Sequence, residues 1–185
     1  MKNVKELIEL GELVGKRLLL RPLLISDVTQ RYVDWLNDPE VNQFIDIRDV
    51  KQNIDMVREY VQSYEGKNNK LLLGIFEKGK YLHIGNITIS SIDWKNGAGS
   101  VGIAVGDKVY WGKGYATEAL SLASDFSFSR LKLHRLEAWI SANNLPSQKL
   151  FKKVGFVQEG ILKDRVKFDT KYVDALIFGL VNKEA

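Results

Sequence analysis

The chain has no cysteine, and this absence excludes several kinds of chemistry. Disulfides, thiolate metal sites and a cysteine nucleophile are ruled out, so any group transfer must proceed without a cysteine-bound intermediate. No apolar run is long enough to cross a bilayer, so we expect no membrane partner. Residues 1–6 include three charged side chains and are unlike a signal peptide, and we expect a cytoplasmic protein that uses no metal.

Charge of either sign is not concentrated anywhere. The 27 Lys and Arg residues exceed the 23 Asp and Glu residues by 4, and the pI is about 9.1. Because the basic residues are spread along the chain without a tract, we expect no nucleic-acid partner. The excess suits a solvated surface or a phosphorylated small ligand. Homo-oligomer formation stays open.

Proline is scarce as well, with 3 in 185 residues, and no linker or repeat interrupts the chain. We therefore expect a single domain over residues 1–185. Strands are predicted at 16–21, 71–76, 82–92, 99–105, 136–140, 156–157 and 172–181, and helices at about 26–37, 50–61, from 114 onward, and 147–154. This order predicts an α+β fold with a mixed, mostly antiparallel sheet of about 6–7 strands, about 4 helices on both faces and one βαβ crossover.

A glycine turn is the most informative segment. Gly112 and Gly114 flank Lys113 where a strand and a short loop give way to a helix. The first N–H groups of a helix have no internal partner and carry partial positive charge, and glycine lets a ligand approach the backbone. The turn predicts either a phosphate cradle or a glycine-capped helix. The spacing does not match a P-loop, and Thr117 replaces the third glycine or alanine of a dinucleotide fingerprint.

Residues 110–119 resemble the acetyl-CoA pyrophosphate loop of the GNAT superfamily of N-acetyltransferases. The similarity is strongest to the branch of ribosomal-protein N-terminal acetyltransferases. Two further segments, 144–156 and 84–105, also resemble motifs of that family. The resemblance therefore extends over about residues 15–182. It implies a GNAT-like fold and an acyltransferase that moves an acetyl group from acetyl-CoA to a primary amine.

The resemblance also implies roles for particular residues. The backbone of the strand before the loop would bind the pantetheine arm, with the N–H of Val105 holding the oxyanion. Asn144 and Ser147 would lie at the thioester. The cofactor-binding set implied in this way is Ile103, Ala104, Val105, Trp111, Gly112, Lys113, Gly114, Tyr115, Ala116, Asn144 and Phe151.

The catalytic acid and base depart from the family pattern. Many relatives have a tyrosine acid where this chain has Phe151, a carboxylate where it has Ser100, and Gln or Arg where it has Val109. Ser147 is the remaining hydroxyl that could act as the acid, with Asn144 beside it. The candidate bases are Asp93, Glu137 and His83. Since the usual acid and base are missing, a non-catalytic acyl-CoA-binding or regulatory domain is the alternative interpretation.

The acceptor is expected to bind between the first two helices. Phe44 supplies an aromatic wall, and Asp46 and Arg48 supply polar groups. The segment resembles GNAT members that acetylate nucleotide-linked amino sugars, where Arg48 would bind a phosphate. A protein N-terminal amine is equally compatible. A polyamine is disfavoured because few acidic residues cluster.

Overall fold

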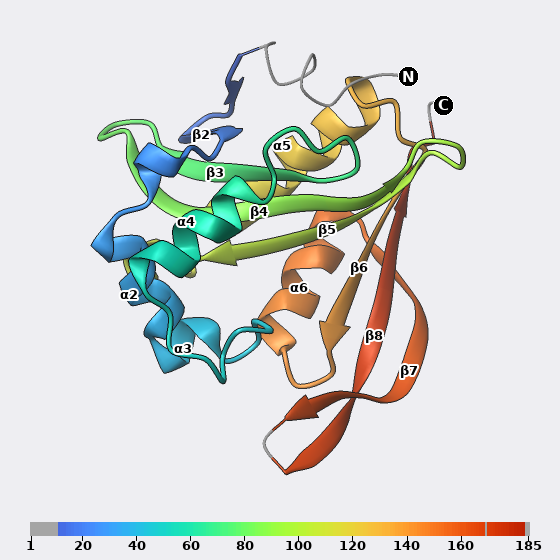
Figure 1. Cartoon of the computed structure of the whole chain (residues 1–185). Helices are drawn as coiled ribbons and strands as arrows, with labels where there is room; N and C mark the ends of the chain where they lie inside the picture. The colour runs from blue at the N-terminus through green and yellow to red at the C-terminus, as the bar shows by residue number, and fades with distance from the viewer. Residues whose placement is uncertain (1–10, 169, 184–185) are drawn as a thin grey trace.

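The computed structural model describes residues 11–168 and 170–183. In this part of the chain, eight strands form one sheet in the order β1-β2-β3-β4-β5-β6-β8-β7 (Figure 1). Their bounds are β1 (Leu13–Val14), β2 (Leu18–Pro22), β3 (Leu71–Glu77), β4 (Leu82–Asp93), β5 (Ala98–Val105), β6 (Arg135–Ser141), β7 (Val157–Phe168) and β8 (Lys171–Val181). Each neighbouring pair is antiparallel except β5 and β6, which are parallel. The predicted α+β class and mixed sheet are confirmed.

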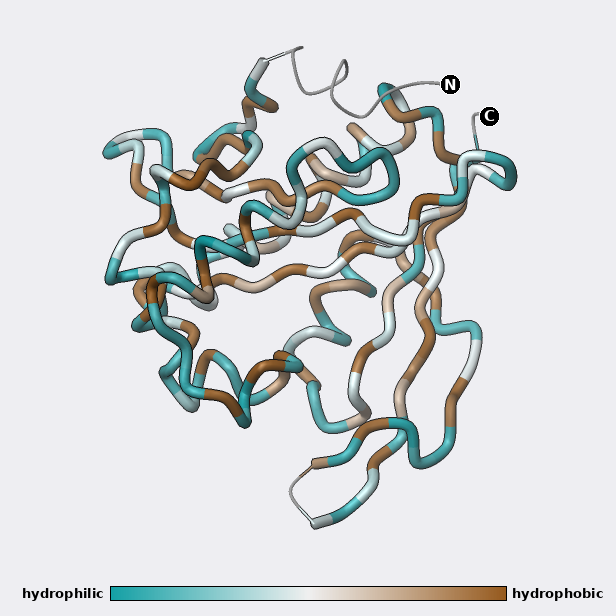
Figure 2. Tube along the Cα trace, in the orientation of Figure 1, coloured by the Kyte–Doolittle hydropathy of each residue, from teal (hydrophilic) through white to brown (hydrophobic). Residues whose placement is uncertain are grey.

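Helices cover both faces of the sheet. The described residues contain α2 (Gln30–Asn37), α3 (Pro39–Asn42), α4 (Ile54–Gln62), α5 (Tyr115–Ser129) and α6 (Leu145–Val154), with short 3-10 turns η1 (Ile25–Asp27) and η2 (Lys108–Tyr110). One core packs α5 and α6 on the sheet, and a second packs α2 and α4 against β2 and β3. Figure 2 shows hydrophobic residues recurring along the strands and hydrophilic ones in the loops. No helix in the described ranges is long and apolar enough to cross a membrane.

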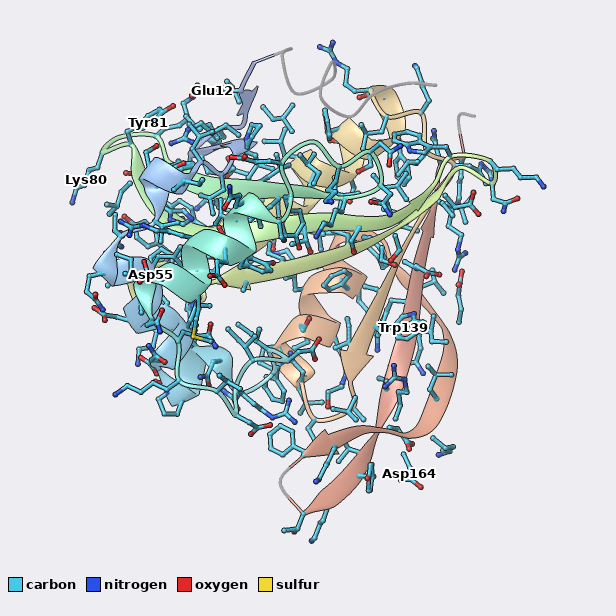
Figure 3. The ribbon with its side chains drawn as sticks, in the orientation of Figure 1. Glu12, Asp55, Lys80, Tyr81, Trp139 and Asp164 are labelled. Carbon is cyan, nitrogen blue, oxygen red and sulfur yellow. The ribbon has the colours of Figure 1, made fainter. Side chains whose placement is uncertain are left out.

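The sheet is larger than the predicted 6–7 strands because β1 and most of β7 escaped prediction. The expected strand at 156–157 is only the start of β7, which continues to Phe168. Most β7 residues are exposed, so the strand lacks the apolar alternation that marks a half-buried strand. β1 has only two residues, too few for a periodic pattern. Glu12, the residue before β1, accepts a hydrogen bond from the hydroxyl of Tyr81 (Figure 3).

Two predicted helix starts were wrong. The helix predicted from about residue 26 starts later, because residues 25–27 form η1 and the carboxylate of Asp27 binds Arg21 in a bidentate ion pair with N–O distances of 2.7 Å. Thr29 is the N-cap instead, and α2 begins at Gln30. The next helix begins at Ile54 and not near Val50, because the side chain of Asn53 accepts hydrogen bonds from the first-turn N–H groups. These two helices therefore start where a side chain caps the first turn.

The βαβ crossover creates an opening in the sheet. β5 leads through α5 to β6, and the two strands pair only from Ala98–Arg135 to Ser100–Glu137. Beyond Ser100, β5 stays with β4 while β6 stays with β8. Figure 1 shows the two strands diverging, with α6 beside the gap. The sheet therefore exposes one edge of β5 from about residue 101 onward.

Candidate active site

A cavity of about 560 Å³ lies at the end of β5, within the range typical of small-molecule sites. Its walls come from the end of β5, the loop and first turn of α5, one side of α6, and α3 with the residues that follow it. The lining residues are Glu40, Val41, Gln43, Phe44, Ile45, Ile103, Ala104, Val105, Tyr110, Trp111, Gly112, Gly114, Tyr115, Ala116, Thr117, Asn144, Pro146, Ser147, Lys149, Leu150 and Lys153. Segments far apart in sequence thus meet around one space.

The edge of β5 offers backbone groups to this cavity. The N–H of Gly106 bonds to the carbonyl of Ile84, and pairing in an antiparallel ladder alternates. Ile103 and Val105 therefore point their N–H and C=O groups away from β4, toward the strand that has diverged. The indole of Trp111 donates to the carbonyl of Val105 at 2.7 Å. The N–H groups of Ile103 and Val105 are thus the donors on this edge that a carbonyl oxygen in the cavity can reach, and Val105 is the last residue of β5 before the loop.

The glycine turn has the geometry of an anion cradle. Gly112 and Gly114 have φ values of +69° and +81°, a region that glycine enters at low cost. Gly114 is the N-cap of α5, and no side chain caps the first turn. A Cβ on Gly112 would meet no atom within 4 Å, so the turn is open above that glycine. The first N–H groups of α5, a helix of 15 residues, therefore lie at the cavity wall, and no side chain accepts hydrogen bonds from them.

Positive charge reaches the cavity from a helix that the sequence analysis did not consider for this role. Lys149 and Lys153 both line it, one turn apart on α6. Lys113 is exposed but is not among the lining residues, and Val109 is exposed away from them. The i, i+4 spacing of the two lysines was the signal that could have identified them.

The start of α6 places two of the expected catalytic residues together. Asn144 is the N-cap, and its side-chain oxygen accepts from the N–H of Ser147 at 3.1 Å. Both residues line the cavity. Phe151 does not, since it is buried in the core with its ring 4.9 Å from that of Phe156. Its expected contact with the cofactor is not supported by this placement, and Leu150 faces the cavity in its stead.

None of the three expected bases lines the cavity. Asp93 lies at the opposite end of the β4–β5 pair, where it accepts from the N–H groups of Lys95 and Asn96. The pKa of Asp93 is lowered, chiefly by a hydrogen bond from the side chain of Asn96. Asp93 is therefore a weak proton acceptor. Glu137 is the last residue of β6 paired with β5, and the Ser100 hydroxyl lies 3.4 Å from its carboxylate.

His83 is half-buried and packs against aromatic residues of the second core. Its ring lies 5.1–5.2 Å from the rings of Tyr32, Trp35 and Phe76. Its Nε2 contacts the carbonyl of Gly85 and the side chain of Asn86 at about 3 Å, while Nδ1 has no hydrogen-bond partner in the described residues. Burial lowers the pKa of His83 and outweighs these contacts. The imidazole is thus a neutral part of the core.

We expect stability to depend on pH through His83. The folded-state pKa is lowered, so the unfolded chain binds more protons, and stability falls as pH drops through about 6.5. Between pH 7.5 and 5.5 the free energy of unfolding should therefore fall. Urea unfolding at both pH values would measure it. His83→Gln should remove that part of the pH dependence, whereas His134→Gln, at an exposed position, should retain it. Equal slopes in both variants would contradict this role.

The expected acceptor residues are divided. Phe44 lines the cavity, whereas Asp46 is exposed outside it. Arg48 donates to the carbonyl of Lys167, and its guanidinium lies 5.2 Å from the ring of Phe168. The ring of Phe44 is 5.9 Å from that of Phe168 as well. Arg48 therefore joins the acceptor segment to the β7–β8 hairpin and is engaged there.

Glu40 is an acidic residue that the sequence analysis missed. It contributes the one carboxylate among the described cavity-lining residues. Lys108 bridges it to Asp38, with N–O distances of 2.9 Å to Glu40 and 2.7 Å to Asp38. Glu40 follows Pro39 at the start of a four-residue helix, which no periodic pattern could have revealed.

Comparison with known proteins agrees with this architecture. Residues 17–157 match the family model of the acetyltransferase (GNAT) domain. The chain is 34% identical over 176 residues to Uncharacterized N-acetyltransferase p20 of Bacillus licheniformis, covering 93% of this chain and 97% of that protein. It also superposes on the structure of RimL, a ribosomal L7/L12 alpha-N-protein acetyltransferase, in complex with coenzyme A. The TM-score is 0.85 at 17% identity, and the match covers 95% of this chain and 100% of that one.

A second solved structure has the same fold. Spermidine N-acetyltransferase from Vibrio cholerae, in complex with CoA and spermine, gives a TM-score of 0.80 at 21% identity, covering 89% of this chain and 95% of that one. At these identities the two solved structures establish the fold. The family model and the sequence relative go further: the chain belongs to the GNAT family and is an N-acetyltransferase.

Proposed function

We propose that this enzyme binds acetyl-CoA in the cavity and transfers its acetyl group directly to a primary amine, with a protein N-terminal amine as the leading acceptor. The observation that carries the proposal is the combination of an uncapped α5 N-terminus with an unpaired β5 edge in one cavity. The N–H groups at the start of α5 can bind a pyrophosphate, and the unpaired edge of β5 can pair with the amides of the pantetheine arm.

The donor would be held mostly by backbone. The residues from Gly112 to Ala116 would present N–H groups to the phosphates, whereas the N–H of Trp111 already bonds to the carbonyl of Lys108. Lys149 and Lys153 add charge that Val109 does not. The β5 edge at Ile103 and Val105 would pair with the pantetheine amides. The thioester, when bound, supplies an acyl carbon that an amine can attack. The N–H of Val105 would then stabilise the oxyanion that develops.

Two proton transfers remain for side chains. An alkyl ammonium has a pKa of about 10.4 and must lose a proton before it attacks. Glu40 is placed to bind that ammonium and accept the proton, directly or through water. After the attack the nitrogen carries a second surplus proton, and as the C–S bond breaks the departing sulfur needs one. The hydroxyl of Ser147 can give its proton to the sulfur and take up the proton that the nitrogen loses. No cysteine exists to carry the acetyl group, so the amine attacks the thioester itself.

The acceptor would enter beside residues 40–45. A nucleotide-linked amino sugar remains a second candidate, but the arginine expected to bind its phosphate, Arg48, is engaged with the β7–β8 hairpin. A terminal amine needs only the carboxylate of Glu40 and the aromatic wall of Phe44. The relatives point to both peptide and polyamine acceptors for their own activities.

Thermal unfolding tests the donor. Acetyl-CoA at a hundredfold excess over Kd should add about 2.7 kcal/mol of stability, whereas NAD and ATP at the same concentration should add far less. Thiol release should then be measured with peptides bearing free N-termini, nucleotide-linked amino sugars and spermidine. Release with a peptide supports the leading acceptor. Stabilisation without release for any amine would contradict the catalytic proposal.

A further inference from the structure

Arg17, the residue before β2, reaches across the sheet to the glycine turn. Its Nη1 donates to the carbonyl of Lys113 at 2.8 Å. Its Nε pairs with Glu118 Oε2 at 2.9 Å, and its backbone N–H donates to Glu118 Oε1 at 2.7 Å. Its guanidinium also lies 4.4 Å from the ring centre of Tyr115. One side chain therefore contacts the turn and the first turn of α5 together.

Glu118 is held in its charged form by these contacts. Partial burial acts to raise its pKa, but the bonds from the backbone and side chain of Arg17 outweigh this and lower it. The chain passes close to the pair, since a Cβ on Gly15 would lie 2.7 Å from Glu118 Oε1. The carboxylate thus fixes the guanidinium and offsets its charge, so the arginine acts chiefly through geometry.

The contact with Lys113 sets the direction of the next N–H. A trans peptide unit is planar, and its C=O and N–H groups point in opposite directions. Because Arg17 holds the carbonyl of Lys113, the N–H of Gly114 in the same unit is directed away from Arg17. Gly114 lines the cavity, and Arg17 does not. The side chain therefore orients the cradle from behind, outside the ligand's reach.

We propose that Arg17, held by Glu118, is a positioning residue that orients the backbone N–H groups of the glycine turn toward the pyrophosphate of acetyl-CoA. This inference rests on the proposed function and adds a residue to its donor site. A methionine keeps the length of the side chain without its donors. A lysine keeps the charge but not the planar fork that reaches both partners.

The test compares donors with and without a pyrophosphate. Calorimetry should show that Arg17→Met raises the Kd for CoA about tenfold, the size of one charge-assisted hydrogen bond. Arg17→Lys should raise it nearly as much. With acetyl-pantetheine as the acetyl donor, kcat/KM should be the same for the wild type and both variants, because that donor does not use the cradle.

Arg21→Met is the matched control, since Arg21 on β2 also binds a carboxylate, but its partner Asp27 belongs to η1 and not to the glycine turn or α5. It should lower Tm and leave the Kd for CoA unchanged. An unchanged Kd in Arg17→Lys, or equal losses with acetyl-CoA and acetyl-pantetheine, would overturn the positioning role. Arg17→Lys keeps the test decisive if the methionine variant is unstable. A wild type that fails to bind CoA would instead refute the proposed function.

Discussion

Gly112→Asp is expected to abolish acetyl-CoA binding while the protein stays folded. Gly112 lines the cavity with φ of +69°, and its added side chain would project into open space where phosphate is proposed to bind. Two like charges about 4 Å apart repel by about 4 kcal/mol near a protein surface. Since about 1.4 kcal/mol is a factor of ten, the Kd should rise at least about a hundredfold. Calorimetry with acetyl-CoA would measure the change.

Gly66→Asp provides the matched control for this substitution. Gly66 has φ of +66°, and a Cβ there also meets no atom within 4 Å. It lies between α4 and β3 and does not line the cavity. The control therefore reproduces the backbone strain and the added charge without touching the donor site. Similar Kd values for the two variants would show that the cradle is not at the glycine turn.

Glu40→Gln should lower kcat/KM for the amine about a hundredfold at neutral pH, the lower end of the usual effect of a general base. The amide keeps the size of the side chain but cannot bind the ammonium as an anion or take its proton. The Kd for acetyl-CoA should not change, because the phosphates are proposed to bind on the other wall. Steady-state kinetics with the best acceptor of the panel would measure both quantities.

The pH profile separates this role from a structural one. As pH rises toward the amine pKa of about 10.4, more acceptor is already neutral, and the defect of Glu40→Gln should shrink. Glu59→Gln, at an exposed position on α4, should match the wild type throughout. A defect that persists unchanged at high pH would assign Glu40 to packing or binding alone.

The elements with strong local signals were predictable from the sequence. The strands that became β3, β4 and β5 carry regular apolar runs, and Gly97 and Gly155 mark a turn and a helix end with φ of +64° and +103°. The crossover followed from the change of period after Gly114. In each case neighbouring residues contain the information, so the sequence alone predicted the glycine turn and the end of α6 at Val154.

Residues defined by tertiary contacts could not be predicted in this way. Glu40 reaches the cavity because α3 packs beside the end of β5, and Arg17 reaches Lys113 across 96 positions of sequence. His83 looked like a base because it is ionisable, but the aromatic rings that bury it come from α2 and β3. Arg48 looked available because its partner, the carbonyl of Lys167, is 119 positions away. Sequence spacing has no information on such pairs.

The ion pair between Lys108 and Glu40 has a consequence for selectivity. The carboxylate proposed to receive the acceptor already holds an ammonium group, which the chain itself supplies at 2.9 Å. An incoming amine therefore exchanges one cation for another and gains little from charge alone. Asp38, which also contacts Lys108, can keep the lysine after such an exchange. Lys108 thus competes with the acceptor for the carboxylate of Glu40. Acceptors are therefore selected by the shape of the groups around the nitrogen and not by its charge.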